Sequence, residues 1–379
     1  VFGRVRYVDN SVNGGFTAYA VGGTIAPIQD ITFRGNFTRS FRAPAISELF
    51  SPQSSAFGFV GQPCENVNAG PNPDVRATNC AAFLNAFPNA NLDPSADASI
   101  PILSGGNPNL QNEEADAYTI GVVLQPRFLS RFVLAVDYVN VVIDNPIISL
   151  GTGDLLSGCF DNPDFDTSDP ANGNQFCSQI RRQPAGTIGT LPNGQQGNIG
   201  GFVINDPLNP GVRTGFVNGV QFSYEAIQGV LDWQLPNIFG SNGTLSFNAN
   251  ALYTLKRDFN NLGVVTTRSD GTFGDPQFSA QLNTRYFTDD YGFLFSTNFV
   301  GAQRATRDDL GIEIREFNNR DPYATFNTSV YFNVEENFRF TFAVTNLLDR
   351  QFQNNYFGAA NGIEDTLGRR YSVTARTRF

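Results

Sequence analysis

The 379-residue chain has 25 basic and 35 acidic side chains, a net charge of -10, and neither His nor Met. This balance lacks the basic footprint that nucleic-acid binding requires. The absence of His excludes a Ser-His-Asp triad within the chain and removes the commonest metal ligand. No stretch approaches the roughly 18 consecutive apolar residues of a membrane helix. A membrane barrel stays compatible with the composition, because only alternate residues of its strands are apolar.

Alternation of apolar and polar side chains predicts twelve antiparallel strands. In one of them Phe338, Phe340 and Phe342 share a face, while Arg339 and Thr341 share the other. Most of the strands have about the nine to eleven residues that a tilted barrel strand needs. The predicted strands are Phe2–Val8, Thr17–Pro27, Ile31–Phe41, Ala115–Gln125, Arg131–Ile143, Arg213–Ile227, Thr244–Arg257, Gln277–Thr288, Gly292–Gln303, Tyr323–Val334, Phe338–Leu348 and Arg369–Phe379.

The connections between these strands alternate between short and long. The short ones are Ile28–Asp30, Pro126–Ser130, Asp289–Tyr291 and Glu335–Asn337, and a somewhat longer one, Gln228–Gly243, belongs to the same side. The long ones are Arg42–Glu114, Asp144–Val212, Asp258–Pro276, Arg304–Pro322 and Asp349–Gly368. An up-and-down meander puts each set at one end, and outer-membrane barrels have short periplasmic turns and long extracellular loops. The sequence therefore predicts an all-β, antiparallel transmembrane barrel.

The last predicted strand carries the same signal at its strongest. Tyr371, Val373 and Ala375 fall on one face, opposite Arg376. Such a period of two marks a strand between two different media. The strand ends on the aromatic Phe379, as bacterial outer-membrane barrels do, and we expect this residue on the periplasmic side.

Four cysteines form two local pairs, each bracketing a polar loop. Cys64 pairs with Cys80 and Cys159 with Cys177 in the expected pattern of two loop disulfides, which form in a non-reducing compartment. A zinc site is the alternative, but no Cys-x-x-Cys is present and no His is available. Both pairs fall in long connections, so they agree with the extracellular assignment.

The loop between Cys159 and Cys177 is also a candidate for calcium binding, because it contains closely spaced carboxylates. Its spacing does not match the EF-hand, whose terminal Glu is absent, so we expect a solvated acidic loop tied by a disulfide. Its carboxylates are Asp161, Asp164, Asp166 and Asp169. We assign no catalytic residue, metal site or cofactor, and we expect no enzyme activity.

Two sets of side chains are candidates for contact with a ligand or with the barrel contents, although the ligand-binding residues stay unassigned. Alternation predicts that the first set points into the lumen; it comprises Arg34, Asn36, Gln281, Asn283, Arg285, Asn298 and Asn327. The second set consists of loop aromatics, for which packing within the loops is the expected role; it comprises Phe57, Phe59, Phe160 and Phe165. We expect Arg42 to pair with a loop carboxylate such as Glu48.

Four stretches resemble segments of TonB-dependent outer-membrane receptors, in the order of that family. They are Ser40–Phe50 (SFRAPAISELF), Gly106–Gly121 (GNPNLQNEEADAYTIG), Val344–Phe352 (VTNLLDRQF) and Leu367–Phe379 (LGRRYSVTARTRF). The resemblance implies a 22-stranded barrel closed by an N-terminal plug. Only about twelve strands are predicted here, so we expect residues 1–379 to be the C-terminal part of such a barrel, without the plug and the early strands.

The resemblance implies active import of a scarce nutrient, such as a siderophore, cobalamin or an oligosaccharide, across a Gram-negative outer membrane. Energy would come through TonB and its inner-membrane motor complex, by way of the missing N-terminal part. The other expected partners are membrane lipid, lipopolysaccharide and the small-molecule or oligosaccharide ligand. Two alternatives remain: a complete twelve-stranded barrel, such as an autotransporter translocator or passive channel, and a soluble β-rich binding protein.

Overall fold

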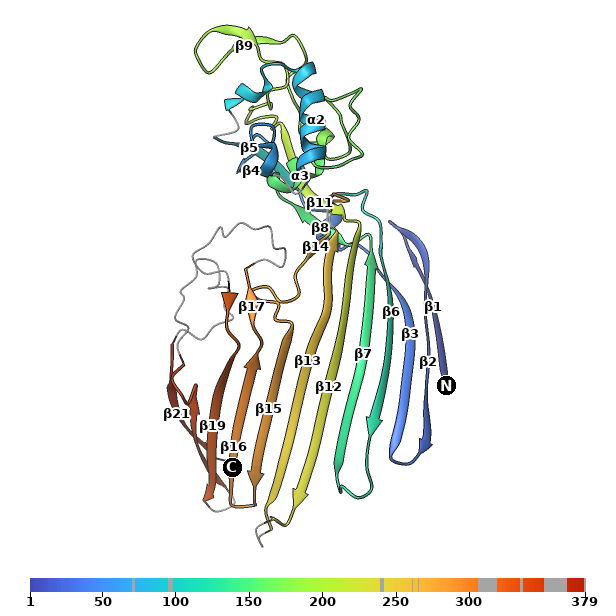
Figure 1. Ribbon diagram of the computed structural model, residues 1–379, viewed down its shortest axis with the longest axis vertical. Helices are drawn as coiled ribbons and strands as arrows, with labels where there is room; N and C mark the ends of the chain where they lie inside the picture. Colours follow the sequence, from blue (N-terminus) through green and yellow to red (C-terminus); the bar gives the residue numbers. More distant parts are fainter. Residues whose placement is uncertain are drawn as a thin grey trace.

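Twelve long strands pair in chain order to form one curved antiparallel sheet (Figure 1). The computed structural model describes residues 1–69, 72–94, 98–238, 242–260, 262–264, 266–305, 319–334, 337–350 and 367–377. The long strands are β1 (Phe2–Asn10), β2 (Gly14–Ile28), β3 (Ile31–Arg42), β6 (Glu113–Leu124), β7 (Phe132–Asp144), β12 (Gln221–Pro236), β13 (Thr244–Asn260), β15 (Phe278–Phe287), β16 (Tyr291–Val300), β19 (Tyr323–Val334), β20 (Phe338–Thr345) and β21 (Arg370–Thr377). The meander and the twelve strands are as the alternation predicts. Arg378 and Phe379 lie outside the described residues.

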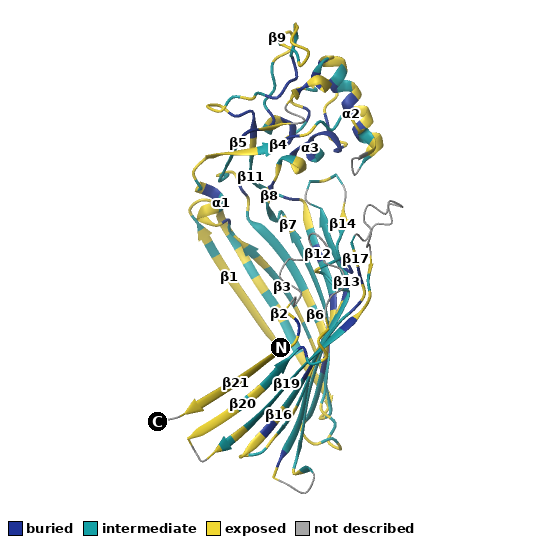
Figure 2. Cartoon of the chain, turned by 90° about the vertical axis from the view of Figure 1, so that its left-hand side faces the viewer, coloured by how far each residue is buried: buried dark blue, intermediate teal, exposed yellow. Residues whose placement is uncertain are grey.

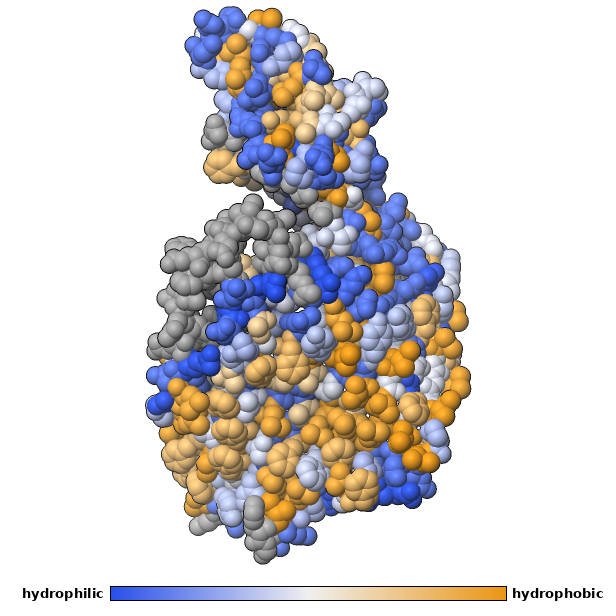
Figure 3. Space-filling view, viewed as in Figure 1, coloured by the Kyte–Doolittle hydropathy of each residue, from blue (hydrophilic) through white to orange (hydrophobic). Residues whose placement is uncertain are grey.

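The two edges of the sheet curve toward the same side, so one face is concave (Figure 2). The convex face carries a hydrophobic band across its middle (Figure 3). Phe295 of β16 belongs to this face and stacks on Phe326 of β19, with ring centroids 5.7 Å apart. Its neighbour Ser296 pairs in register with Asn283 and Asn327 on the opposite, polar face. An apolar outer face and a polar inner face are the pattern of a sheet that separates lipid from water.

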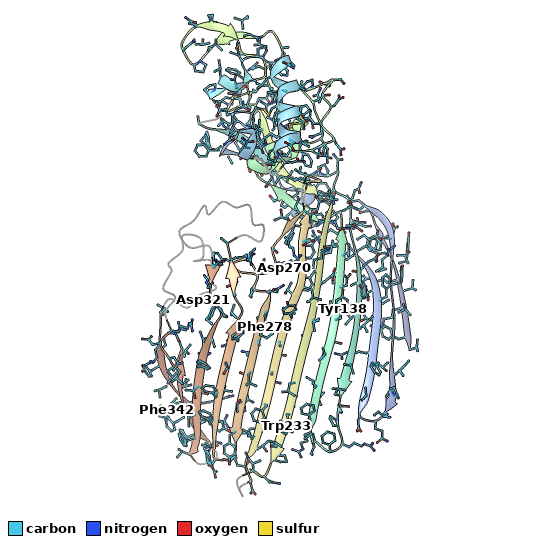
Figure 4. The ribbon with its side chains drawn as sticks, viewed as in Figure 1. Tyr138, Trp233, Asp270, Phe278, Asp321 and Phe342 are labelled. Carbon is cyan, nitrogen blue, oxygen red and sulfur yellow. A yellow bond between two sulfur atoms is a disulfide. The ribbon has the colours of Figure 1, made fainter. Side chains whose placement is uncertain are left out.

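Aromatic side chains mark both limits of the band. Trp233, near the short turns, lies 6.0 Å from Phe132 and 5.7 Å from Phe247 between ring centroids (Figure 4). At the other limit Tyr118 and Tyr138 lie 5.9 Å apart. Such aromatic belts form where a barrel passes from hydrocarbon to headgroups.

The sixth predicted strand, Arg213–Ile227, is wrong in its limits. The structure divides it into β11 (Val212–Asn218), which belongs to another sheet, and β12, which runs on to Pro236. The division falls at Gly219. Asn218, the last residue of β11, uses its side-chain amide to bond the backbone at Gln111 and Asn145. The predicted short connection Gln228–Gly243 is therefore mostly strand, and the connection itself covers only residues 237–243.

The first two long connections fold together into a separate unit beyond one end of the sheet, which we call the cap (residues 43–112 and 145–220; Figure 1). Its four-stranded sheet has the order β4-β5-β11-β8 and is flanked by α2 and α3. The cap elements are α1 (Ile46–Phe50), β4 (Ser54–Phe59), α2 (Pro73–Ala86), β5 (Ser99–Gly105), β8 (Ile147–Leu150), α3 (Thr152–Phe160), β9 (Ile188–Thr190), β10 (Gln196–Asn198) and β11, with 3-10 turns η1 (Val67–Ala69), η2 (Ala90–Leu92) and η4 (Cys177–Gln179). The remaining short strands are β14 (Thr267–Arg268), β17 (Gln303–Arg304) and β18 (Asn319–Arg320).

None of the described helices is both long and apolar enough to cross a membrane.

The cap has its own hydrophobic core, drawn from both connections. Phe83 of α2 and Phe160 of α3 are almost fully buried and meet edge to face at 5.3 Å. The disulfides Cys64–Cys80 and Cys159–Cys177 are both formed, and Cys80, Cys159 and Cys177 belong to this core. Each disulfide closes a loop within one connection, so the union of the two connections depends on noncovalent contacts.

A buried ion pair is the central polar contact between the two connections. Arg76 of α2 donates two hydrogen bonds to Asp161, at 2.5 and 2.6 Å, and their side chains are 8% and 0% exposed. Asn79, one turn further along α2, donates to the carbonyl oxygens of Phe160 and Asn162. Because both charges are buried and bonded, removal of one partner leaves the other uncompensated.

The face assignment predicts unequal costs for a charge placed on the two faces. Phe295→Arg should lower the free energy of unfolding by up to about 2–4 kcal/mol in phospholipid vesicles, the range for arginine on the lipid face of a membrane strand. Asn283→Arg is the matched control on the polar face and should cost less than about 1 kcal/mol. Urea titration of the reconstituted variants measures both values, and equal costs would contradict the assignment.

The buried ion pair predicts a cap that loosens when one charge is removed. Asp161→Ala should destabilise the cap by about 3–5 kcal/mol, because Arg76 stays charged and buried. Hydrogen exchange of peptides from α2 and α3 reports this as faster exchange. The double change Arg76→Met with Asp161→Leu should recover most of the protection, and Asp164→Ala, on an exposed side chain of the same loop, should leave it unchanged. Protection that survives Asp161→Ala would refute the role of the pair.

Candidate functional site

The concave face of the sheet carries the polar residues that the sequence assigns to a lumen. Strand register puts all seven of the predicted residues on this face, and Gln281 donates a hydrogen bond to Asn298 at 3.0 Å. The seven side chains line the wall as a ladder of amides and arginines spread over several strands: Arg34, Asn36, Gln281, Asn283, Arg285, Asn298 and Asn327. Such a wall can hydrogen-bond a polar solute or a protein segment within the barrel.

One ion pair on this face reaches across an intervening strand. Arg34 of β3 bonds both carboxylate oxygens of Asp137 on β7, and Gly121 of β6 lies between them in register. A Cβ at Gly121 would come within 2.0 Å of the Asp137 carboxylate. Glycine is therefore the residue that leaves room for the pair, which ties three strands of the wall together.

The expected partner of Arg42 is present, and a second carboxylate joins it. Arg42 bonds Glu48 of α1 at 3.1 Å and Glu113 of β6 at 2.6 Å. Glu113 also accepts a bond from the backbone N–H of Ile147 at 2.7 Å. This cluster fixes the positions at which both cap connections leave the sheet, so Arg42 is structural. The sequence indicated that Glu113 lies in a loop, but in the structure this residue begins β6.

A second polar cluster lies beside the C-terminal end of β13. Asp270 is fully buried and accepts bonds from the side chain of Arg268, at 2.6 Å, and from the backbone of Arg257 (Figure 4). Arg268 also donates to the carbonyl of Leu255, the residue skipped where the register of β13 shifts against β12. The cluster satisfies a backbone group that the bulge leaves unpaired.

The four loop aromatics named from the sequence separate into two groups. Phe160 and Phe165 are buried in the cap core, whereas Phe57 and Phe59 on β4 are 73% and 67% exposed. The predicted packing within the loops is therefore correct for Phe160 and Phe165 only. The exposed pair lies on the outer strand of the cap sheet.

A guanidinium that the sequence did not single out packs into the aromatic core of the cap. Arg182 stacks over Phe83 at 4.7 Å and donates to the carbonyl of Gly201 at 2.9 Å. Burial against these rings lowers the pKa of Arg182 to about 10, while the charge of Asp93 opposes this shift. The side chain remains charged at neutral pH and is held by cation–π contact.

Three carboxylates of the acidic loop, those of Asp161, Asp166 and Asp169, accept hydrogen bonds from other residues of the cap. Asp161 forms the ion pair with Arg76, and Asp169 accepts a hydrogen bond from the Asn172 side chain. Hydrogen bonds from Ser168 lower the pKa of Asp166. Among the described residues, no group of three or more Cys, Asp or Glu is arranged to hold a metal ion.

A pocket of about 450 Å³ lies at the base of the cap, where β5, β8 and β11 meet the segment that leads into β6. Leu103, Leu150 and Phe216 contribute its apolar lining, and Arg213 and Gln179 contribute polar groups. This site was not predicted from the sequence, in which both connections are expected to be loops and Arg213 falls in a predicted barrel strand. Residues 106–109 of its lining belong to the stretch Gly106–Gly121 that the sequence singles out. The other parts come from both connections, so that stretch alone could not reveal a pocket.

Comparison with known proteins places the chain in a family. The family model for the TonB dependent receptor-like beta-barrel matches residues 3–347. The siderophore receptor PirA from Acinetobacter baumannii is 14% identical, with a TM-score of 0.57, over 99% of this chain and 43% of that receptor. A mutant of the ferric enterobactin receptor from Pseudomonas aeruginosa, solved with enterobactin, is 15% identical, with a TM-score of 0.58, over 98% and 42%. A search of the curated proteins finds no match.

These likenesses concern the fold, and the chain spans less than half the length of the two receptors. The family match agrees with the in-order meander, the apolar convex face and the long connections at one end. The chain belongs to the TonB-dependent receptor-like β-barrel family, whose members are outer-membrane transport receptors.

Proposed function

We propose that residues 1–379 form the C-terminal part of the barrel of a longer TonB-dependent receptor. The observation that supports this most strongly is the pairing of the two outermost strands. In the described part of the chain, β1 pairs only with β2 and β21 only with β20. Membrane strands need partners on both sides, because lipid offers no hydrogen bonds to a free edge. Earlier strands of the same receptor would supply these partners, and a plug would fill the concave side.

The receptor imports a scarce nutrient across a Gram-negative outer membrane, with energy delivered through TonB and its inner-membrane motor complex. Siderophores, cobalamin and oligosaccharides are the substrate classes under this proposal, and the chain itself performs no chemistry. The cap receives the ligand on the extracellular side, while the polar wall of the sheet contacts the plug and water. Membrane lipid meets the convex band, and lipopolysaccharide meets the zone around Tyr118 and Tyr138.

The proposal predicts a native protein much larger than this chain. An antibody against the cap should detect, in outer membranes of the source organism, a heat-modifiable band at more than twice the 41.4 kDa of these residues. Heat-modifiable migration distinguishes a folded barrel from a soluble protein. A band near 41 kDa would favour the complete twelve-stranded barrel, as an autotransporter translocator or passive channel.

Uptake assays test the transport step directly. Cells that express the full-length protein should accumulate one of a labelled panel of ferric siderophores, cobalamin and oligosaccharides. Deletion of the receptor gene or of TonB should each abolish this accumulation, and re-expression of the missing protein should restore it. Accumulation that persists without TonB would refute active import.

A further inference from the structure

The pocket at the base of the cap has rigid walls. Beside it β5 and β11 run parallel, with Leu103 next to Arg213 in register, and β11 pairs on its other side with β8. Gly215 has φ +145°, and a Cβ there would lie 2.5 Å from the carbonyl oxygen of Gly105. Glycine at this position lets the two strands meet closely, so the pocket is part of a fixed sheet.

The lining divides into an apolar part and a polar part. Leu150 and Leu155 are 4% and 1% exposed and belong to the cap core, so the apolar part is continuous with well-packed protein. Asn107 is already held, because it donates to the carbonyl of Phe216 and accepts from the N–H of Asn109. Gln53 and Thr214 donate to the carbonyls of Gly106 and Leu103, and Asn109, Gln179 and Arg213 are the other polar side chains of the lining.

Among the described residues, Arg213 is the only charged one in the lining, although acidic residues outnumber basic ones in the chain by 35 to 25. It is exposed, and within the described ranges no salt bridge engages it. Its planar guanidinium can bond a carboxylate through two parallel N–H groups. Among the described residues of the lining, one cation is present with several apolar side chains and no carboxylate, a combination that favours a negative head joined to an apolar body.

We propose that this pocket binds an organic anion consisting of a carboxylate or similar oxyanion head and an apolar body. Arg213 bonds the head, Gln179 supplies a further amide, and Leu103, Leu150 and Phe216 enclose the body. The role of the site rests on the proposed function: the pocket is the first binding site that the imported ligand meets. The segment from Gly106 to Asn112 links the pocket directly to the start of β6.

Ligand-observed fluorine NMR on the full-length receptor in detergent tests the assignment with three probes of equal shape. 4-Fluorobenzoate should bind, whereas neutral 4-fluorobenzamide and cationic 4-fluorobenzylamine should bind much more weakly. Arg213→Gln should weaken benzoate binding on the order of 10- to 100-fold, the worth of one charge-assisted contact. Arg213→Lys keeps the charge and should retain part of the affinity.

Arg181→Gln is the matched control, because it removes a cap arginine that bonds Asn209 outside the pocket lining. It should leave benzoate binding unchanged, and hydrogen exchange should show an intact cap in every variant. Equal binding of benzoate and benzamide, equal loss in Arg181→Gln, or no binding of benzoate would overturn the assignment. TonB-dependent uptake without benzoate binding would refute anion binding in the pocket and leave the proposed receptor function standing. Benzoate binding without TonB-dependent uptake would refute the receptor function and leave anion binding in the pocket standing.

Discussion

Pairing of backbone groups between neighbouring strands is the constraint on which this molecule depends. Each long strand between the two edges bonds the strand before it and the strand after it, so the twelve strands form one continuous sheet. This pairing also fixes the faces, because residues in register share a face across every strand. The polar wall, the apolar convex band and the ion pair of Arg34 with Asp137 all follow from the register.

The cap is held by different forces. It buries aromatic side chains from two connections that are separated by β6 and β7, and its disulfides act only within each connection. Buried polar groups such as Arg76 and Asp161 are costly when unpaired and give the two connections a specific way to meet. Specific alignment matters here, because β5 and β11 come from different connections and must lie side by side to form the pocket.

Side-chain periodicity was sufficient to predict the barrel strands, since a strand between lipid and water leaves a period of two in the sequence. It gave the wrong limits for β12, where Gln228 and Gly229 interrupt the apolar residues; yet Leu231, Trp233 and Leu235 continue on the convex face up to Pro236. The cap could not be predicted in this way. Its core joins residues far apart in the chain, and its short elements, such as α3, have no long periodic pattern. Arg213 was consequently assigned to the wrong sheet, and the pocket was missed.

The union of two connections in one core has a consequence for binding affinity. A ligand captured by separate flexible loops must offset the conformational entropy that the loops lose when they become ordered. In the cap most of that entropy is already lost on folding, because the core, the two disulfides and the Arg76–Asp161 pair hold both connections in place. The cap is therefore preorganised, and more of the contact energy with a ligand is available as affinity.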